Sequence, residues 1–248
     1  MQNAPEIKRG MVVVAHADDA EFGCSGTVAK WCSQGWEVVY VLCTDGSKGS
    51  SDRQMTQENL SKIRKQEQIN AGKVLGLKDI TFLNYPDSFL EPTLELRREI
   101  ARQIRIHQPD ILITTNPTRN LDSGWGLGHP DHIAAGEAAM SAVFPTARDH
   151  MTFPEMIDEG LEPHKVAEVW VIGSPNPNFW VDVTDHIETS IESLSQHVSQ
   201  VGDRNIKEVA THMKDRRRKT ATGRGIKYAE EFQQIVLDTR LQSKQTKQ

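Results

Sequence analysis

The segment Met11–Glu21 reads MVVVAHADDAE, and this stretch decides the fold. Its first five residues, Met11–Ala15, form a valine-rich apolar run, which is typical of a short strand buried on both faces of a sheet. A histidine and two adjacent aspartates follow directly. The spacing of the next residues predicts a helix over Gly23–Gln34, which Gly35 ends. The segment therefore predicts a buried strand that runs through an ionisable loop into a helix.

Strand and helix patterns alternate over the first two thirds of the chain. Further strands are expected at Glu37–Cys43, Ile80–Leu83, Ile111–Thr115, Val166–Ile172 and Phe179–Val183. Helices are expected at Thr56–Leu75, Leu94–His107 and Pro130–Val143. Such alternation implies a mostly parallel sheet with helices on both faces. The sequence thus predicts an α/β fold, a Rossmann-like three-layer α/β/α arrangement with a helical C-terminal region.

The 248 residues fit a single domain, in which residues 185–248 are expected to form a helical extension. That extension contains a basic stretch between Asp203 and Lys227, with nine Lys or Arg residues against three Asp or Glu. A charge run of this kind is usually a solvated face or a partner contact. Because the whole chain carries a net charge of -5, we expect no nucleic-acid partner.

Composition also bears on where the protein works. No apolar run approaches the roughly 18 residues that a membrane span needs, and residues 1–10 lack the apolar centre of a signal peptide. The cysteines Cys24, Cys32 and Cys43 show neither paired nor metal-type spacing, which indicates reduced thiols. We therefore expect a cytoplasmic protein without a membrane partner.

The first loop carries the strongest chemical signal. Ligands of parallel sheets bind at the carboxyl ends of the strands, which is where His16, Asp18 and Asp19 lie. Two adjacent carboxylates repel each other unless a cation or a proton offsets them, and a divalent metal is the simplest cation. We expect His16 and Asp19 to bind such a metal, which leaves Asp18 to act as a base.

A second signal is the sequence His129-Pro130-Asp131-His132. Pro130 suits the first position of a helix, so His129 would cap the helix and His132 would follow one turn later on the same side. One histidine can complete the metal site while the other acts as a catalytic acid or oxyanion donor. Two histidines and one carboxylate are a known ligand set of catalytic zinc, with a position left for water. Taken singly, each motif is more often a helix cap with surface charge.

Together the two motifs resemble the signatures of the PIG-L/LmbE family of zinc-dependent N-deacetylases. The first match continues through Glu21, Gly23 and Gly26-Thr27. Weaker matches are Thr44-Asp45-Gly46, Arg64 with Glu67, Leu75-Gly76, Tyr85-Pro86-Asp87, His197-Val198-Ser199-Gln200 and Tyr228-Ala229-Glu230. The resemblance runs from about Val12 to Phe232. Ala17 departs from the family pattern, which usually has a proline there, and this implies a less rigid loop.

The resemblance implies a set of site residues. It implies one zinc ion per subunit, with other divalent metals possible, and the ligands His16, Asp19 and His132. It implies that Asp18 is the general base and that His129 stabilises the oxyanion or protonates the leaving amine. Asp131 is then expected to tune His129.

The resemblance also implies substrate contacts and an assembly. Arg64 and Asp87 correspond to positions that hold sugar hydroxyls. His197 resembles a residue that approaches a neighbouring subunit's site in some oligomeric members. Trp125 is a candidate for stacking on a sugar ring. A homo-oligomer, either a trimer or a hexamer, is expected.

The function implied is removal of the acetyl group from an N-acetylglucosamine-type sugar or glycoside, a small amidosugar. Hydrolysis of another acyl amide is the first alternative. A non-haem iron oxygenase uses the same ligand types, although its ligands usually lie in β-rich barrels. A dinucleotide-binding module would suit the sheet, with Asp45 as the ribose acid, but its first turn needs glycines. An inactive scaffold is disfavoured because all five expected catalytic positions are filled.

Overall fold

The apolar run Met11–Ala15 lies in and just after β1 (Arg9–Val14), at the centre of a seven-stranded sheet. The computed structural model describes residues 8–121, 127–201 and 206–238. The strand order is β3-β2-β1-β4-β5-β7-β6. The other strands are β2 (Glu37–Thr44), β3 (Asp79–Tyr85), β4 (Ile111–Thr115), β5 (Glu168–Ile172), β6 (Phe179–Asp182) and β7 (Ala229–Val236). The predicted α/β class with a mostly parallel sheet is confirmed.

The order of the strands creates a switch point beside β1. β1 pairs in parallel with β2 on one side and with β4 on the other, while β3 and β5 extend the parallel part outward. The chain builds one side of the sheet first and then returns to build the other. Crevices at such reversals, outside the carboxyl ends of the strands, are where α/β proteins bind ligands. The loops that follow β1 and β4 meet at this place.

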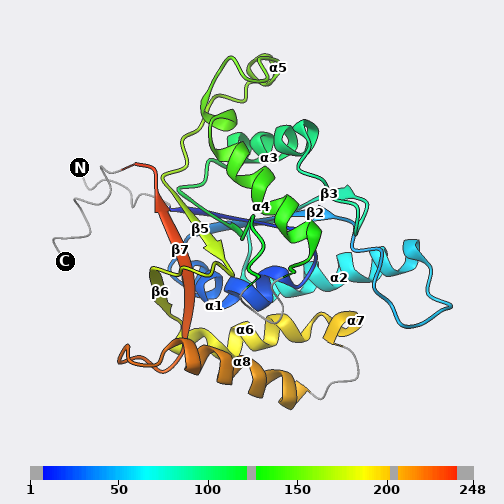
Figure 1. The fold of residues 1–248 in the computed structure, drawn as a ribbon, viewed down its shortest axis with the longest axis vertical. Helices are drawn as coiled ribbons and strands as arrows, with labels where there is room; N and C mark the ends of the chain where they lie inside the picture. Colours follow the sequence, from blue (N-terminus) through cyan, green and yellow to red (C-terminus); the bar gives the residue numbers. More distant parts are fainter. Residues whose placement is uncertain (1–7, 122–126, 202–205, 239–248) are drawn as a thin grey trace.

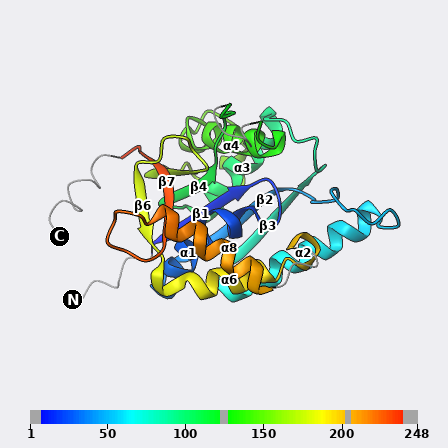
Figure 2. The ribbon, with the colours of Figure 1, turned by 60° about the horizontal axis from the view of Figure 1, so that its bottom comes forward.

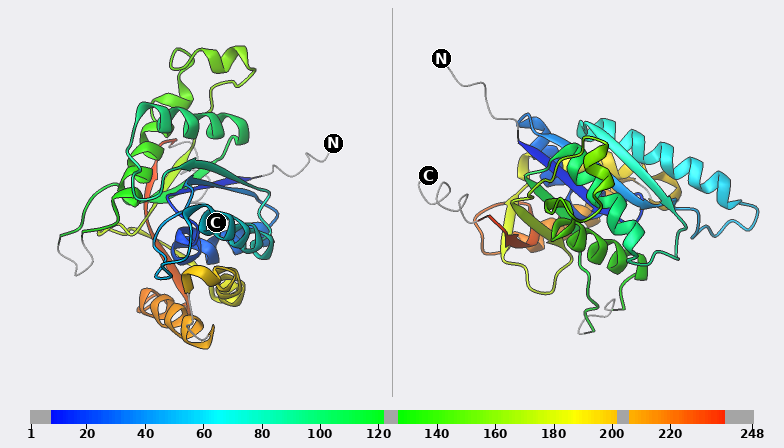
Figure 3. Two further views of the ribbon diagram at one scale, coloured as in Figure 1. Left: turned by 90° about the vertical axis from the view of Figure 1, so that its right-hand side faces the viewer. Right: turned by 90° about the horizontal axis from the view of Figure 1, so that it is seen from above.

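Helices cover both faces of the sheet (Figures 1 and 2). One face carries α3 (Leu94–His107) and α4 (Pro130–Val143). The other carries α1 (Asp19–Ser33) and α2 (Gln57–Leu75). α6 (Ile187–Ser195) packs on the outer side of these two helices, and α8 (Ile206–Thr220) packs on α6 and β7 (Figure 3). The short helices are α5 (Glu155–Asp158), α7 (Val198–Val201), η1 (Thr146–Arg148) and η2 (Thr184–His186). Of the described helices, none is long and apolar enough to cross a membrane.

The alternation of side chains along β1 explains why this strand must be buried on both faces. Val12 and Val14 belong to the core under α1 and α6, whereas Met11, Val13 and Ala15 belong to the core under α3 and α4. All five residues are fully buried. Successive side chains of a strand point to opposite faces, so a strand between two helical layers needs an unbroken apolar run.

The C-terminal region differs from the expected helical extension. Its helices end at Thr220, and Ala229–Val236 forms β7, which pairs antiparallel with both β5 and β6. The reason is a buried carboxylate in this strand. Glu230 is fully buried, accepts hydrogen bonds from the backbone N–H groups of Gly26 and Thr27, and pairs with Arg217 at 2.7 Å. Because these partners satisfy its charge, a glutamate can be buried in this strand. The strand therefore lacks the apolar run by which the other strands are recognised in the sequence.

Gly136 of α4 provides a test of how closely this helix must approach β4. A Cβ atom at this position would lie 2.2 Å from the carbonyl oxygen of Thr115, closer than van der Waals contact allows. We predict that Gly136→Ala lowers the free energy of unfolding by roughly 1–3 kcal/mol. Without the clash, alanine would instead raise it by about 1 kcal/mol through helix propensity. Urea unfolding measures the difference. Glu137→Ala, on the exposed side of the same helix, is the control and should change stability by less than about 0.5 kcal/mol.

Candidate active site

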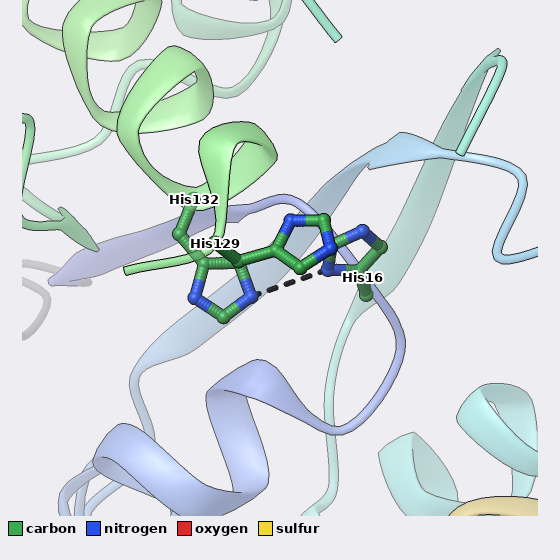
Figure 4. Close-up of side chains that lie close together, drawn as sticks. All are labelled: His16, His129 and His132. Atoms are coloured by element: carbon green, nitrogen blue, oxygen red, sulfur yellow. Dashed lines mark hydrogen bonds between the residues drawn. The ribbon is translucent and has the colours of Figure 1, made fainter. Parts of the chain in front are cut away.

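Two segments more than a hundred residues apart meet at the switch point of the sheet (Figure 4). His16 follows β1, and Asp19 is the first residue of α1. His129 is the N-cap of α4, where Pro130 opens the helix, and His132 lies in its first turn. The imidazoles of His16, His129 and His132 converge, so that one ring nitrogen of each lies within 4.8 Å of the others.

Three donors have the spacing that a tetrahedral ion requires. His16 Nδ1 lies 3.2 Å from His132 Nε2, which lies 3.0 Å from Asp19 Oδ1. The other oxygen of Asp19 is 3.6 Å from His16 Nδ1. With bonds of about 2.0–2.1 Å, two ligands of tetrahedral zinc stand about 3.3 Å apart. The three distances bracket this value, with one oxygen of Asp19 near each imidazole. Because the donor atoms of His16, His129 and His132 also lie close together, this His/Asp cluster can bind a metal ion.

The second nitrogen of His16 is held by carboxylates. His16 Nε2 lies 3.1 Å from Asp131 and 3.2 Å from Asp87. Asp131, fully buried, also accepts hydrogen bonds from the backbone N–H groups of Ser88 and Leu90. When the imidazole is neutral, these carboxylates keep the proton on Nε2 and leave the lone pair of Nδ1 for a metal. Asp131 was expected to tune His129, but its carboxylate lies farther from that ring, 3.9 Å from Nδ1.

His129 is prepared to donate rather than to bind a metal. Its Nδ1 accepts a hydrogen bond from the backbone N–H of Asp131 at 3.2 Å. The proton of the neutral ring must therefore be on Nε2. Burial lowers the pKa of His129, and the neighbouring His16 lowers it further, so this ring is neutral near pH 7. Asp19 is thus a better third metal ligand than His129.

The two adjacent aspartates have opposite electrostatics. Burial alone would raise the pKa of Asp19, but His132 and His16 outweigh it and hold that pKa well below its usual range. Burial raises the pKa of Asp18 well above its usual range, and the charges of Asp19 and Glu21 add to the effect. Asp19 is therefore ionised and suited to bind a cation, whereas Asp18 is suited to exchange a proton.

The backbone of Asp18 adopts an uncommon conformation, and two glutamines form hydrogen bonds to the peptide group that precedes it. Its φ of 83° is in the left-handed region, where residues other than glycine are uncommon. The N–H of Asp18 donates to Gln68 Oε1 at 3.4 Å, and the carbonyl of Ala17 accepts from Gln200 Nε2 at 2.6 Å. Sequence reasoning missed both roles, although Gln200 belongs to a quoted motif.

The two residues Asp87 and Arg64, which are expected to contact the substrate, differ in how close they lie to the histidine cluster. Asp87 is beside His16 and accepts a hydrogen bond from the backbone N–H of Lys48. Arg64 is buried, donates to the carbonyls of Gly46 and Lys48 at 2.7 Å each, and lies 3.7 Å from Asp87. The structure thus brings Asp87 to the cluster and places Arg64 one layer behind it.

His197 lies apart from the cluster in this chain. Its side chain is fully buried, and its Nε2 is 3.3 Å from Glu21 Oε2, which is also fully buried. Gln68 donates to the other oxygen of Glu21 at 3.0 Å. His197 therefore belongs to a buried polar chain behind the first loop, and no surface of it is available to a substrate. Trp125 lies outside the described residues.

A cavity of about 370 Å³ opens beside the cluster. Its described lining includes Asp19, Phe22, Thr115, His129, His132, Ile172 and Arg216. Arg216 comes from the basic stretch of the sequence, where one charge among nine gave no sign of facing a site. Phe22 was missed for a similar reason, because a single aromatic residue in a helix is usually part of the core.

Comparison with known proteins gives concordant matches. The family model described as "PIG-L: GlcNAc-PI de-N-acetylase" matches residues 11–143. The diacetylchitobiose deacetylase of Thermococcus kodakarensis is 32% identical over 195 residues, which are 79% of this chain and 71% of that protein. A probable N-acetyl-alpha-D-glucosaminyl L-malate deacetylase 2 of Bacillus anthracis is 29% identical over 77% of this chain and 80% of its own. The structure of N,N'-diacetylchitobiose deacetylase from Pyrococcus horikoshii, in complex with the inhibitor MPG, superposes with a TM-score of 0.84 at 28% identity, covering 93% of this chain and 85% of that one.

Metal binding should be coupled to release of a proton. Burial opposes protonation of His16, but hydrogen bonds to Asp131, Asp19 and Asp87 prevail and raise its pKa to about 12. The imidazole is thus protonated at pH 7 without metal and neutral when it binds one. We predict that Zn²⁺ affinity rises with pH between 6 and 8 and that binding releases about one proton. Calorimetric titration in buffers of different ionisation enthalpy measures both.

Two variants test the identity of the ligands in the same titration. His132→Ala should weaken Zn²⁺ binding by more than the about 10–100-fold that loss of an outer partner causes. His150→Ala, whose side chain is 75% exposed, should leave the affinity unchanged. Equal affinities of these two variants, or an affinity independent of pH, would contradict the assignment.

Proposed function

Since the chain belongs to the PIG-L family of GlcNAc de-N-acetylases, we propose that it hydrolyses the acetamide of an N-acetylglucosamine-type sugar or glycoside and releases acetate. The observation that carries this proposal is the spacing of the donors of His16, Asp19 and His132, which suits a tetrahedral ion. Diacetylchitobiose deacetylases and a GlcNAc–malate deacetylase are among the relatives, so a small amidosugar is the proposed substrate.

We assign the metal to His16, Asp19 and His132, and we propose zinc because two imidazoles and one carboxylate suit it. A zinc ion bound there would lower the pKa of a water molecule and polarise the acetamide carbonyl. Asp131 and Asp87 hold the imidazole of His16 in the tautomer that presents Nδ1. These outer carboxylates fix the direction of the ligand as well as its protonation.

Asp18 is the proposed general base. Burial raises the pKa of Asp18 well above its usual range, which makes its carboxylate a stronger base for taking a proton from water. The oxygen of that water forms a bond to the acyl carbon as the proton moves to Asp18. The C–N bond then breaks, the nitrogen receives a proton, and the products are acetate and the amino sugar.

His129 is the proposed oxyanion donor. Its Nδ1 is engaged by the backbone of α4, so its Nε2–H is the group free to donate. A donor of this kind, aimed at the negative charge of the tetrahedral intermediate, typically contributes about 3–4 kcal/mol to its stabilisation. The ring is neutral at the start, and it donates a hydrogen bond without first having to be protonated.

We propose that Asp87 contacts the substrate directly and that Arg64 acts on it indirectly. Asp87 is beside His16 and has an oxygen near the cluster. Arg64 orders the Gly46–Lys48 loop and acts on a sugar through that loop and through Asp87. A trimer or hexamer stays a prediction, which light scattering after size-exclusion chromatography measures. A role for His197 in a neighbouring subunit would require its buried side chain to be exposed.

A screen for acetate release tests the proposed function. Zinc-loaded protein is incubated with N-acetylglucosamine, diacetylchitobiose and simple glycosides of N-acetylglucosamine, and acetate is measured enzymatically. Turnover of at least one member is expected. Silence across the whole panel, with zinc bound, would contradict the proposal and favour a different acyl amide.

Replacing Asp18 separates catalysis from metal binding. We predict that Asp18→Asn lowers kcat by about 10²–10⁴-fold, because the amide cannot accept the proton. Zinc content and stability should stay at wild-type values, since the Asp18 side chain does not cap α1. Asp185→Asn, an exposed aspartate, is the matched control. Full activity of Asp18→Asn would disprove the assignment of the base.

A further inference from the structure

The basic stretch of the sequence resolves into residues with different partners. Along α8, Lys214 pairs with Glu188, Arg217 with Glu230, and Arg218 with Asp215. Arg216 forms no ion pair or hydrogen bond with any residue that the structure describes. Its side chain is exposed and lines the cavity that contains Asp19, His129 and His132. The Arg216 guanidinium thus lines the candidate active site with no hydrogen-bonded partner among the described residues, and the carboxylates whose charge acts on it are those of Glu230 and Glu231.

The position of Arg216 is fixed by its neighbour. Arg217 is buried, donates to the backbone carbonyl of Phe22 at 2.9 Å and pairs with Glu230 at 2.7 Å. These bonds attach α8 to the beginning of α1, directly beside the metal cluster. Arg216 is therefore held at the cavity by the backbone of a firmly anchored helix.

Arg216 lies where two cavities adjoin. It also lines a second cavity of about 390 Å³, whose described wall includes Phe22, Val209 and Met213. Since Arg216 and Phe22 belong to the walls of both cavities, they mark the boundary between them. A ligand whose acetamide is at the metal cluster would reach Arg216 with its substituent.

The charges of the first cavity point to the kind of substituent. Among its described lining residues, Asp19, His129 and His132 are already assigned to metal binding and catalysis. The remaining charged group is Arg216. A guanidinium gains most from an anion, because its planar donors bind the two oxygens of a carboxylate or phosphate together. A neutral sugar offers no such partner.

We propose that Arg216 is a specificity-determining residue and that the preferred substrate is an amidosugar with an anionic substituent, a carboxylate or a phosphate. This inference rests on the proposed function, whose chemistry it leaves unchanged. It distinguishes the chain from an enzyme built only for neutral sugars such as diacetylchitobiose.

Matched substrates test the proposal. The neutral ones are the methyl glycoside of N-acetylglucosamine and diacetylchitobiose, and the anionic ones are N-acetylglucosamine 1-phosphate and a carboxymethyl glycoside. We expect wild-type kcat/KM to be at least about 10-fold higher for an anionic member, because hydrogen bonds between charged groups are stronger than those to neutral ones. Comparing the phosphate with the carboxylate identifies the anion. The preference should weaken as salt is added.

Variants assign the preference to Arg216. Arg216→Gln should lower kcat/KM for the preferred anionic substrate about 10–100-fold, mainly through KM, and change that for neutral substrates less than about twofold. Arg216→Lys should restore part of the loss. Lys219→Gln, an exposed charge on the same helix, is the control and should behave as wild type. Equal losses for neutral and anionic substrates, or no anionic preference in the wild type, would overturn the inference.

A binding measurement keeps this test separate from that of the proposed function. Calorimetry on zinc-loaded Asp18→Asn protein, with and without Arg216→Gln, reports the affinity for N-acetylglucosamine 1-phosphate and for the carboxymethyl glycoside without hydrolysis. A loss of affinity on Arg216→Gln supports the anion site, and unchanged affinity for both ligands overturns it. Absence of turnover in wild type with every substrate contradicts the deacetylase function alone.

Discussion

The site depends on one buried carboxylate at the start of α4. Asp131 accepts from the backbone N–H groups of Ser88 and Leu90 and lies 3.1 Å from the imidazole of His16. It thereby joins the loops that follow β1, β3 and β4, which reach the same edge of the sheet from different parts of the sequence. Asp131 thus adds a buried connection between the segments of His16 and His132, beside the pairing of β1 with β4 and the direct contact of the two imidazoles.

Four aspartates at the candidate site have different pKa values because their surroundings differ. Asp19 faces two imidazoles and stays ionised, whereas Asp18 is buried beside like charges and holds a proton more tightly. Asp87 and Asp131 face the far nitrogen of His16, which lowers the pKa of both against the effect of burial. Residues of the same type thus differ in protonation because their neighbours differ.

The sequence predicts much of this arrangement because local patterns carry it. The apolar run of β1, the proline at the start of α4 and the carboxyl-end rule were enough to bring His16, Asp19 and His132 together. The features that the sequence did not predict depend on contacts between residues far apart in the chain. β7 was not predicted, because Glu230 interrupts its apolar pattern. This buried carboxylate is satisfied by Arg217 and by the backbone of α1.

Tertiary contacts also give two residues partners that the sequence did not indicate. Asp131 is two positions from His129 along the chain, and its carboxylate lies 3.1 Å from the imidazole of His16 and 3.9 Å from that of His129. His197 resembles a residue that approaches a neighbouring subunit's site, and in this chain its buried side chain lies 3.3 Å from the carboxylate of Glu21. A pattern shows which residue types are present, whereas the partner of a buried charge is decided by tertiary packing.

The peptide between Ala17 and Asp18 shows how far the site extends. Gln68 of α2 accepts a hydrogen bond from its N–H group, and Gln200 of α7 donates one to its carbonyl oxygen. Gln200 lies well beyond residue 143, the last residue matched by the family model. The backbone conformation of Asp18, in the first loop, therefore depends on a residue that lies far along the chain.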